Sequence, residues 1–292
     1  MKKLPITIFA LMFCTSLQAQ EEPEEKKTSE SAFWKHILIS ESMETAEKKE
    51  KPAQFMLTFP KNAPSSWLIN LGLGYKWDSS ETGISKIMLE YHKNTLTEKK
   101  QDNLQVGYGM VEKLTPNANS ALYINADGRY VYDAVGTKNS LTSTVLFSWY
   151  KRGEEGLNLN TETKFNKGKR ELLLTLYGGT QIQGIFNAKD KDAKGFIIRP
   201  LYILGAQYQF MNDSGKPFIR LSLDYTGRVD AVNTSEYKED YTDLFKAGAD
   251  IFIVNEPVNI SIGGSFNYGS DPMKGLAEQQ FWLVSLNIGK KK

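Results

Sequence analysis

The stretch Trp67-Leu68-Ile69-Asn70-Leu71-Gly72-Leu73-Gly74-Tyr75-Lys76-Trp77 decides the fold of this chain. Its odd positions hold Trp, Ile, Leu, Leu, Tyr and Trp, whereas most of its even positions hold Asn, Gly, Gly and Lys. Side chains of a β-strand point to opposite faces in turn, so this strand has one apolar face with aromatic rings at both ends. Ten residues of a tilted strand rise roughly 25 Å, the height of the apolar band on a transmembrane barrel. The stretch therefore predicts a strand that crosses a lipid bilayer.

The same alternation recurs along the chain in about twelve segments. These are residues 67–77, 87–92, 104–110, 122–133, 145–150, 157–164, 172–183, 202–210, 219–228, 245–253, 258–268 and 282–288. No helical periodicity interrupts them. A sheet in lipid must close because an open edge would leave backbone groups without hydrogen-bond partners, and single-chain bacterial barrels have an even number of strands. We therefore predict an all-β fold, a closed antiparallel transmembrane β-barrel of about 12 strands over residues 66–292.

Aromatic residues stand near the ends of several segments, as Trp and Tyr do at membrane–water interfaces. The residues assigned to the two interfaces are Trp67, Tyr75, Trp77, Tyr108, Trp149, Tyr208, Tyr225, Tyr268 and Trp282. A soluble β-sandwich is the structural alternative, because the same alternation suits a sheet with one buried face. The sandwich predicts that the tryptophans are buried, whereas the barrel predicts that they face lipid.

Residues 1–19 are predicted to be a signal peptide for export. Lys2 and Lys3 form a basic start, residues 5–13 form an apolar core, and residues 17–19 (Leu-Gln-Ala) resemble a cleavage site. Cys14 is the only cysteine, and the bulky Phe13 before it argues against lipidation. Removal of the peptide leaves a chain without thiols, so neither a disulfide nor a thiolate metal site is expected.

Residues 20–65 differ from the rest because they are rich in Glu, Lys, Ser and Thr and carry few large side chains. Such a composition favours a disordered or loosely structured segment. Two interpretations remain open, a polar periplasmic extension and a plug segment inside the barrel. The weak alternation at 54–59 ends at Pro60, which suits either a short strand or a segment tucked against the barrel mouth.

These features resemble bacterial outer-membrane β-barrel proteins in general, including the porin-like ones, over roughly residues 66–289. The final segment, Phe281 to Gly289, resembles the closing strand of that class, although three lysines follow it where an aromatic residue is common. The resemblance implies a location in the outer membrane of a Gram-negative bacterium. It also implies contact with outer-membrane lipid and lipopolysaccharide, insertion by the barrel assembly machinery, and a monomer.

Charged residues recur at positions expected to face the lumen. They are Glu90, His92, Asp127, Arg129, Glu162, Lys164, Arg199, Arg220, Asp224, Arg228, Lys246 and Asp250. Anions and cations are roughly matched, so they could brace a narrow barrel through salt bridges or line a pore that selects solutes. The charges of 219–228 are expected to face Arg199 on one neighbouring strand and Lys246 and Asp250 on the other.

Three functions remain open for such a barrel. The first is a small pore or passive channel with a charged polar lumen. The second is a non-conducting anchor or binding protein, acting through its outer loops or through an unknown periplasmic partner of residues 20–65. Residues 235–243, with Tyr237 and Tyr241 among acidic residues, are the best candidate for an external contact surface. The third and weakest is an envelope lipid hydrolase. A barrel of about twelve strands leaves a narrow interior, which suits both of the first two functions.

The residues argue against catalysis and nucleic-acid binding. Only His36 and His92 could act as a histidine base, and no Gly-x-Ser-x-Gly motif is present. We expect His36 to lie in the extension and His92 near the periplasmic end of the lumen. A net charge of +2 is too small to imply a nucleic-acid partner. No catalytic residue, cofactor or metal is therefore predicted.

Overall fold

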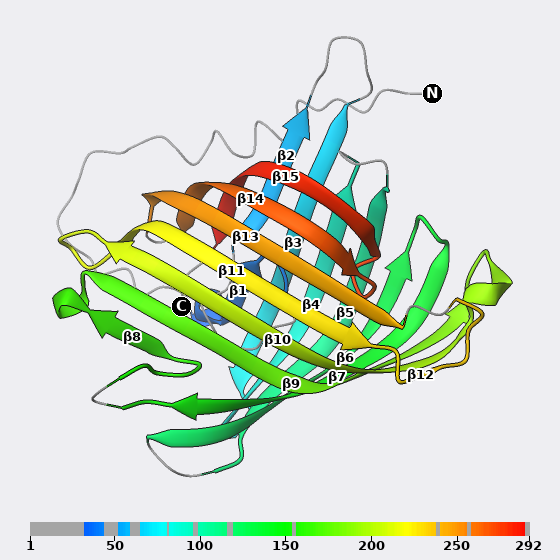
Figure 1. Cartoon of the computed structure of the whole chain (residues 1–292), viewed down its shortest axis with the longest axis horizontal. Coiled ribbons are helices and arrows are strands. Elements are labelled where there is room, and N and C mark those ends of the chain that lie inside the picture. The colour runs from blue at the N-terminus through cyan, green and yellow to red at the C-terminus, as the bar shows by residue number, and fades with distance from the viewer. Residues whose placement is uncertain are drawn as a thin grey trace. The chain divides into compact units, whose positions relative to one another are not determined.

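Twelve antiparallel strands close into a barrel in the computed structural model of the chain (Figure 1). The structure describes residues 32–43, 52–58, 65–80, 82–95, 99–115, 119–153, 156–237, 240–255 and 258–289. In order round the barrel, the strands are β2 (Ala53–Thr58), β3 (Ser66–Asp78), β4 (Gly83–Asn94), β5 (Gln101–Lys113), β6 (Ser120–Asp133), β7 (Lys138–Lys151), β9 (Arg170–Asn187), β10 (Gly195–Met211), β11 (Pro217–Val229), β13 (Tyr241–Val254), β14 (Asn259–Asp271) and β15 (Leu276–Gly289). Strand β15 pairs with β2 and so closes the ring. The predicted closed antiparallel barrel is confirmed as a fold.

Shorter elements accompany the ring. They are η1 (Ala32–His36), β1 (Ile37–Ser40), β8 (Glu162–Phe165), η2 (Asn166–Gly168), η3 (Lys191–Ala193) and β12 (Val232–Asn233). The barrel belongs to one compact unit, Lys35–Lys292, and of the other unit, Met1–Trp34, only residues 32–34 are described. The predicted signal peptide therefore lies outside the described residues. No described helix is long and apolar enough to cross a membrane.

The barrel turns its apolar side chains outward and its polar side chains inward. On the outer face, Trp149 is 52% exposed and Trp282 is 78% exposed. On the inner face, Glu90 and Asn287 are 0% and 2% exposed. A β-sandwich would bury its apolar faces between two layers, so the exposed tryptophans exclude the sandwich alternative.

One predicted strand, 157–164, does not belong to the ring. Asn160 has a left-handed φ of 56°, which breaks the extended backbone. Its side-chain nitrogen donates to Trp149 O at 3.0 Å and to Leu176 O at 2.9 Å, and its Oδ1 accepts from Leu176 N. The side chain thus takes hydrogen bonds that a strand backbone would make between β7 and β9. Only the four-residue β8 forms beyond it.

The strand that completes the ring is β2, in the segment where sequence analysis left two interpretations open. It pairs with β3 from Gln54–Asn70 to Thr58–Ser66 and with β15 around Phe55. The wall therefore begins before residue 66, where we had placed its boundary. β2 has only six residues and alternates weakly, so its sequence pattern is too short to distinguish it from the polar segment around it.

The added strand reverses the direction expected for β3 to β7, whereas the direction expected from β9 onward is unchanged because the predicted strand 157–164 is absent from the ring. Ile37 pairs with Tyr75 near the end of β3, so β1 begins at the end of the barrel where β4 also begins. His92 lies near the other end of β4, away from the end expected to be periplasmic. His92 therefore lies at the end of β4 opposite to the start of β1, whereas the prediction placed it at the end where the wall begins.

Strands β1 and β2 share one edge of β3 and divide its length between them. β1 pairs with β3 from Ile37–Tyr75 to Ser40–Gly72, and β2 takes over at Gln54–Asn70. After β1, residues 41–43 leave the wall. Within the described residues, β2 meets β15 at only three residue pairs, whereas β14 and β15 pair over most of their length. The closing seam is therefore the least hydrogen-bonded contact of the ring.

Candidate functional site

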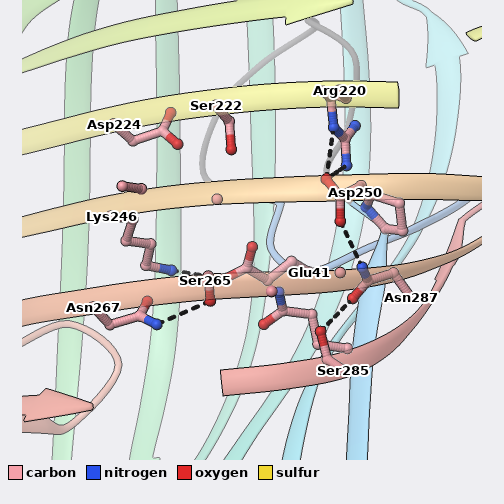
Figure 2. A pocket seen from close by; sticks show the side chains of 16 residues that line it. Glu41, Arg220, Ser222, Asp224, Lys246, Asp250, Ser265, Asn267, Ser285 and Asn287 are labelled. Atoms are coloured by element: carbon pink, nitrogen blue, oxygen red, sulfur yellow. Dashed lines mark hydrogen bonds and ion pairs between the residues drawn. The ribbon is translucent and has the colours of Figure 1, made fainter. Parts of the chain in front are cut away.

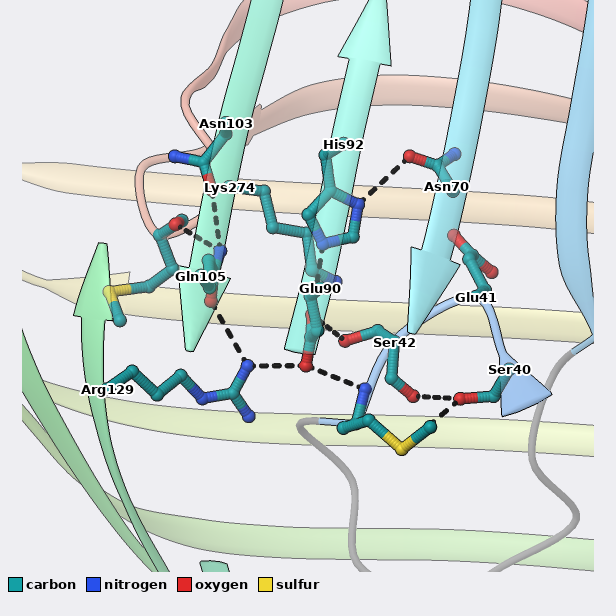
Figure 3. A network of polar contacts seen from close by, with 12 residues as sticks. Ser40, Glu41, Ser42, Asn70, Glu90, His92, Asn103, Gln105, Arg129 and Lys274 are labelled. Atoms are coloured by element: carbon teal, nitrogen blue, oxygen red, sulfur yellow. Dashed lines mark hydrogen bonds and ion pairs between the residues drawn. The ribbon is translucent and has the colours of Figure 1, made fainter. Parts of the chain in front are cut away.

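A short stretch, Ser40 to Met43, leaves the barrel wall and lies inside the lumen; we call it the latch. Its first residue, Ser40, is also the last residue of β1, so the pairing of β1 with β3 holds its start. Ser40 Oγ donates to Ser42 O at 2.7 Å and stabilises the change of direction (Figure 3). Glu41 is 6% exposed and Met43 is 2% exposed. The latch is thus enclosed by protein rather than by water.

Glu90 on β4 is the centre of the contacts that hold one side of the latch (Figure 3). Its Oε1 accepts from Met43 N at 2.8 Å and from Arg129 Nη1 at 2.6 Å. Its Oε2 accepts from Ser42 Oγ at 3.0 Å and lies 3.0 Å from His92 Nε2. A buried carboxylate needs such charged and hydrogen-bonding partners, because burial of an unpaired charge costs several kcal/mol. The latch supplies two of these four contacts.

The alternation of side chains along β4 explains why several of its residues contact the latch. Lys86, Met88, Glu90 and His92 occupy alternate positions, so all four point into the lumen. Lys86 Nζ donates to Met43 O at 2.7 Å. Met88 packs against the Met43 side chain in a small buried apolar cluster. One strand therefore holds the latch through a cation, an anion and an apolar side chain.

A second charged cluster lies on β11, β13 and β15 (Figure 2). Arg220 Nε and Nη2 donate to Asp250 Oδ2 at 2.9 and 2.8 Å, and Asn287 Nδ2 donates to Asp250 Oδ1 at 2.8 Å. Lys246 Nζ donates to Glu41 Oε1 at 2.7 Å, which ties the latch to this wall. A cavity of about 50 Å³ lies among these residues. Its size suits a few water molecules.

The turn between β14 and β15 also reaches across the lumen. Asp271 Oδ1 accepts from Arg228 Nη2 at 3.1 Å, and Met273 O accepts from Gln105 Nε2 at 2.9 Å. Gln105 and Met273 are each 1% exposed. This turn and the latch therefore cross-link separate parts of the wall through the interior.

The structure places ten of the twelve predicted lumen residues on the inner face. They are Glu90, His92, Asp127, Arg129, Arg199, Arg220, Asp224, Arg228, Lys246 and Asp250. The expected register also holds for the second cluster, because Arg220 faces Asp250 and Asp224 faces Lys246. Arg199 instead pairs with Asp230 at 2.5 Å.

The other two predicted lumen residues, Glu162 and Lys164, are corrected by the structure. Both lie on β8, beside the start of β9, where the buried residue is Thr163 between them. The Lys164 side chain is 69% exposed. The break at Asn160 explains the error, because it interrupts the strand whose alternation the prediction assumed.

Sequence reasoning missed the latch and Lys86. Lys86 follows the same alternation as Glu90 and His92, so the pattern could have identified it. Glu41 and Ser42 lie in a charge-rich run without periodicity, and no signal in that run points to the lumen.

The predicted interface aromatics lie along the outer face of the strands. Trp67, Tyr75, Tyr108, Trp149, Tyr268 and Trp282 are exposed, whereas Trp77, Tyr208 and Tyr225 are half-buried. Tyr75 and Trp77 lie at one end of β3 and Trp67 at the other. This arrangement places rings toward both ends of the apolar exterior.

The two histidines are both held by protein groups. His36 Nδ1 lies 2.7 Å from Lys76 O. His92 is 0% exposed, and its Nδ1 lies 3.1 Å from Asn70 Oδ1. Among the described residues, no group of three or more His, Cys, Asp or Glu side chains is arranged to hold a metal ion.

The fold and lumen define a class of protein, a closed twelve-stranded antiparallel barrel with an apolar exterior and a polar interior. No protein-family model matches the chain, and no curated protein matches it.

Proposed function

We propose that this barrel lies in the outer membrane of a Gram-negative bacterium and is a narrow pore for small polar solutes, closed at rest by the latch. The apolar exterior supports the membrane location, because a water-soluble protein rarely exposes so continuous an apolar surface. The aromatic residues toward both ends of the strands support it too. Contact with lipid and lipopolysaccharide, and insertion by the assembly machinery, follow from this location.

The latch is the observation that carries the proposal. It is held at Lys246 on β13 and at Glu90 on β4, two strands that are not neighbours in the ring. A segment that is hydrogen-bonded to separate parts of the wall obstructs the passage between them. The walls behind it carry charged and amide side chains, which suit the passage of polar solutes.

Single-channel recording in planar bilayers tests the proposal. Glu41→Lys places a cation beside Lys246 and should release the latch, so we expect at least a tenfold higher open probability than in the unchanged protein. Asp213→Lys is the matched control, because it reverses a carboxylate that pairs with Lys169 but is 96% exposed. We expect the control to behave as the unchanged protein does. An absence of openings in all three proteins would end the pore proposal.

A non-conducting barrel is the second candidate. It is favoured by the near-zero exposure of Glu90, His92 and Gln105, which shows that water has little access to this part of the lumen. In that case the function would lie in the loops, including residues 235–237 and 240–243, or in a partner of residues 20–65. The weaker lipid-hydrolase alternative would require lipase activity that is lost in His92→Ala.

A further inference from the structure

The wall of the lumen binds the latch through contacts of the kind that a peptide-binding site makes with its ligand. Charged wall groups contact its main chain and its acidic side chain, and Met88 with two glycines contacts its apolar side chain. We infer that the lumen contains a binding site for short acidic peptides, which Glu41, Ser42 and Met43 occupy in this structure. This inference rests on the proposed function in one respect, because the latch must be able to leave the site.

Two of the contacts recognise the peptide backbone. Met43 N donates to Glu90 Oε1 at 2.8 Å, and Met43 O accepts from Lys86 Nζ at 2.7 Å. Every residue except proline offers the same N–H and C=O groups, so these contacts do not depend on the side chain. Glu90 and Lys86 therefore provide a general anchor for a peptide backbone.

Two further contacts select side chains. Lys246 Nζ binds the Glu41 carboxylate at 2.7 Å. The Met43 side chain lies over Gly72 and Gly74, where an added Cβ would come within 3.2 Å of Met43 Cγ and Sδ respectively. Because these two glycines have no side chains, they leave room for a long unbranched side chain. The preferred ligand thus carries an acidic residue two positions before a flexible apolar residue.

The site would keep its shape without the latch, because the buried Glu90 has partners on the wall itself. Glu90 remains paired with Arg129 at 2.6 Å and lies beside His92. Lys246 stands opposite Asp224 in the register of β11 and β13. Glu90, the fully buried charge of the site, thus keeps charged partners when the latch withdraws, which disfavours collapse of the site around it. A preorganised site of this kind loses little free energy on binding.

The latch competes with any free peptide from within the same chain. A tethered segment acts at an effective concentration in the millimolar range, so the unchanged protein should bind free peptide weakly. Vacating the site should therefore raise the affinity for a peptide that copies the latch.

Fluorescence anisotropy of a dye-labelled peptide, in detergent, tests this inference. The probe is Ser-Glu-Ser-Met-Glu, which copies residues 40–44. The variant Glu41→Gly/Ser42→Gly/Met43→Gly should bind the probe at least tenfold more tightly than the unchanged protein. A probe with Lys in place of its first Glu should bind at least tenfold more weakly to this variant. Adding Lys246→Gln to the variant should remove most of that discrimination.

Equal binding of the probe by the unchanged protein and the triple variant, including no binding by either, would overturn the inference. Equal binding of the acidic and basic probes would overturn it as well. If the triple variant does not fold, Glu41→Lys replaces it, with the same expected gain in affinity. Anisotropy does not depend on ion flow, so the two proposals can fail separately. Channel openings without peptide binding would refute this inference alone. Peptide binding without channel openings would refute the pore proposal alone.

Discussion

At the scale of single residues, Gly263 shows how closely the lumen side chains are packed. A Cβ at this position would clash with Asp250 Oδ1 and lie 2.6 Å from Asn287 Nδ2. The hydrogen bond between these two side chains therefore passes over a position where a Cβ fits only if the side chains move. Gly264, the next residue, points to the outer face, and a Cβ there would lie 3.8 Å from Leu283 O.

We expect Gly263→Ala to lower the free energy of unfolding by about 1–3 kcal/mol, because it separates Asp250 from Asn287 and leaves buried polar groups unsatisfied. Gly264→Ala is the matched control and should be near neutral. Urea unfolding of both variants in detergent, followed by tryptophan fluorescence, measures the difference. Equal stability of the two variants would show that the Asp250–Asn287 contact is not needed.

At the scale of elements, two loops at one end of the barrel are joined by Asp190 and Tyr237. The Tyr237 hydroxyl donates to Asp190 Oδ2 at 2.5 Å. This hydrogen bond, together with one from Asp192 N, holds the pKa of the Asp190 carboxyl below its ordinary value of 3.8. The same hydrogen bond to Asp190 raises the pKa of Tyr237 above 10.0.

The contact between the loops therefore has two pH limits. The lowered pKa of Asp190 gives stability that is present above 3.8 and lost as the pH falls through the shifted value. The raised pKa of Tyr237 gives stability that is present below 10.0 and lost as the pH rises through the shifted value. We expect Asp190→Asn to lower the pKa of Tyr237, measured by NMR of labelled tyrosine rings and assigned with Tyr237→Phe. An unchanged titration of Tyr237 in Asp190→Asn would contradict the contact.

The seam between β2 and β15 is a second feature at this scale. Phe55 and Leu286 are direct partners across it, and partners in antiparallel strands lie within the range that a disulfide spans. We expect the pair Phe55→Cys/Leu286→Cys to form a disulfide and to stabilise the barrel by roughly 2–4 kcal/mol. The reason is that few ladder hydrogen bonds hold this seam.

The matched control is Leu221→Cys/Ala249→Cys, across the long β11–β13 ladder. The measurement is the temperature at which the folded band disappears in heat-modifiable gel migration, with and without reductant. Oxidation should raise this temperature more for the seam pair than for the control pair. A larger rise in this temperature for the control pair would show that the seam is not the weak contact of the ring.

At the scale of the whole molecule, the apolar exterior predicts contact with lipid. In vesicles whose acyl chains carry bromine, the tryptophan fluorescence should be quenched, because Trp149 and Trp282 point outward. Trp282→Phe should reduce the quenching, since this is the most exposed tryptophan described. Aqueous iodide is the control and should quench little. Strong quenching by iodide with none by brominated lipid would refute the membrane location.

The barrel and most of its lumen residues follow from the sequence alone. Alternation with a period of two is a local property, and it sorts each side chain to the inner or outer face before any partner strand is known. This reasoning placed Glu90, Arg220 and Asp250 correctly on the inner face. It failed at 157–164, because a single left-handed residue, Asn160, ends the extended backbone without changing the pattern.

Only the tertiary structure decided how the lumen is filled. Glu41 and Lys246 are 205 positions apart, and closure of the ring between β15 and β2 is what brings them together. Periodicity says which face a residue takes, but it carries no information about which strands lie across the interior from one another. The latch, and with it the proposed closure of the pore, therefore depends on long-range contacts between segments that local sequence patterns leave independent.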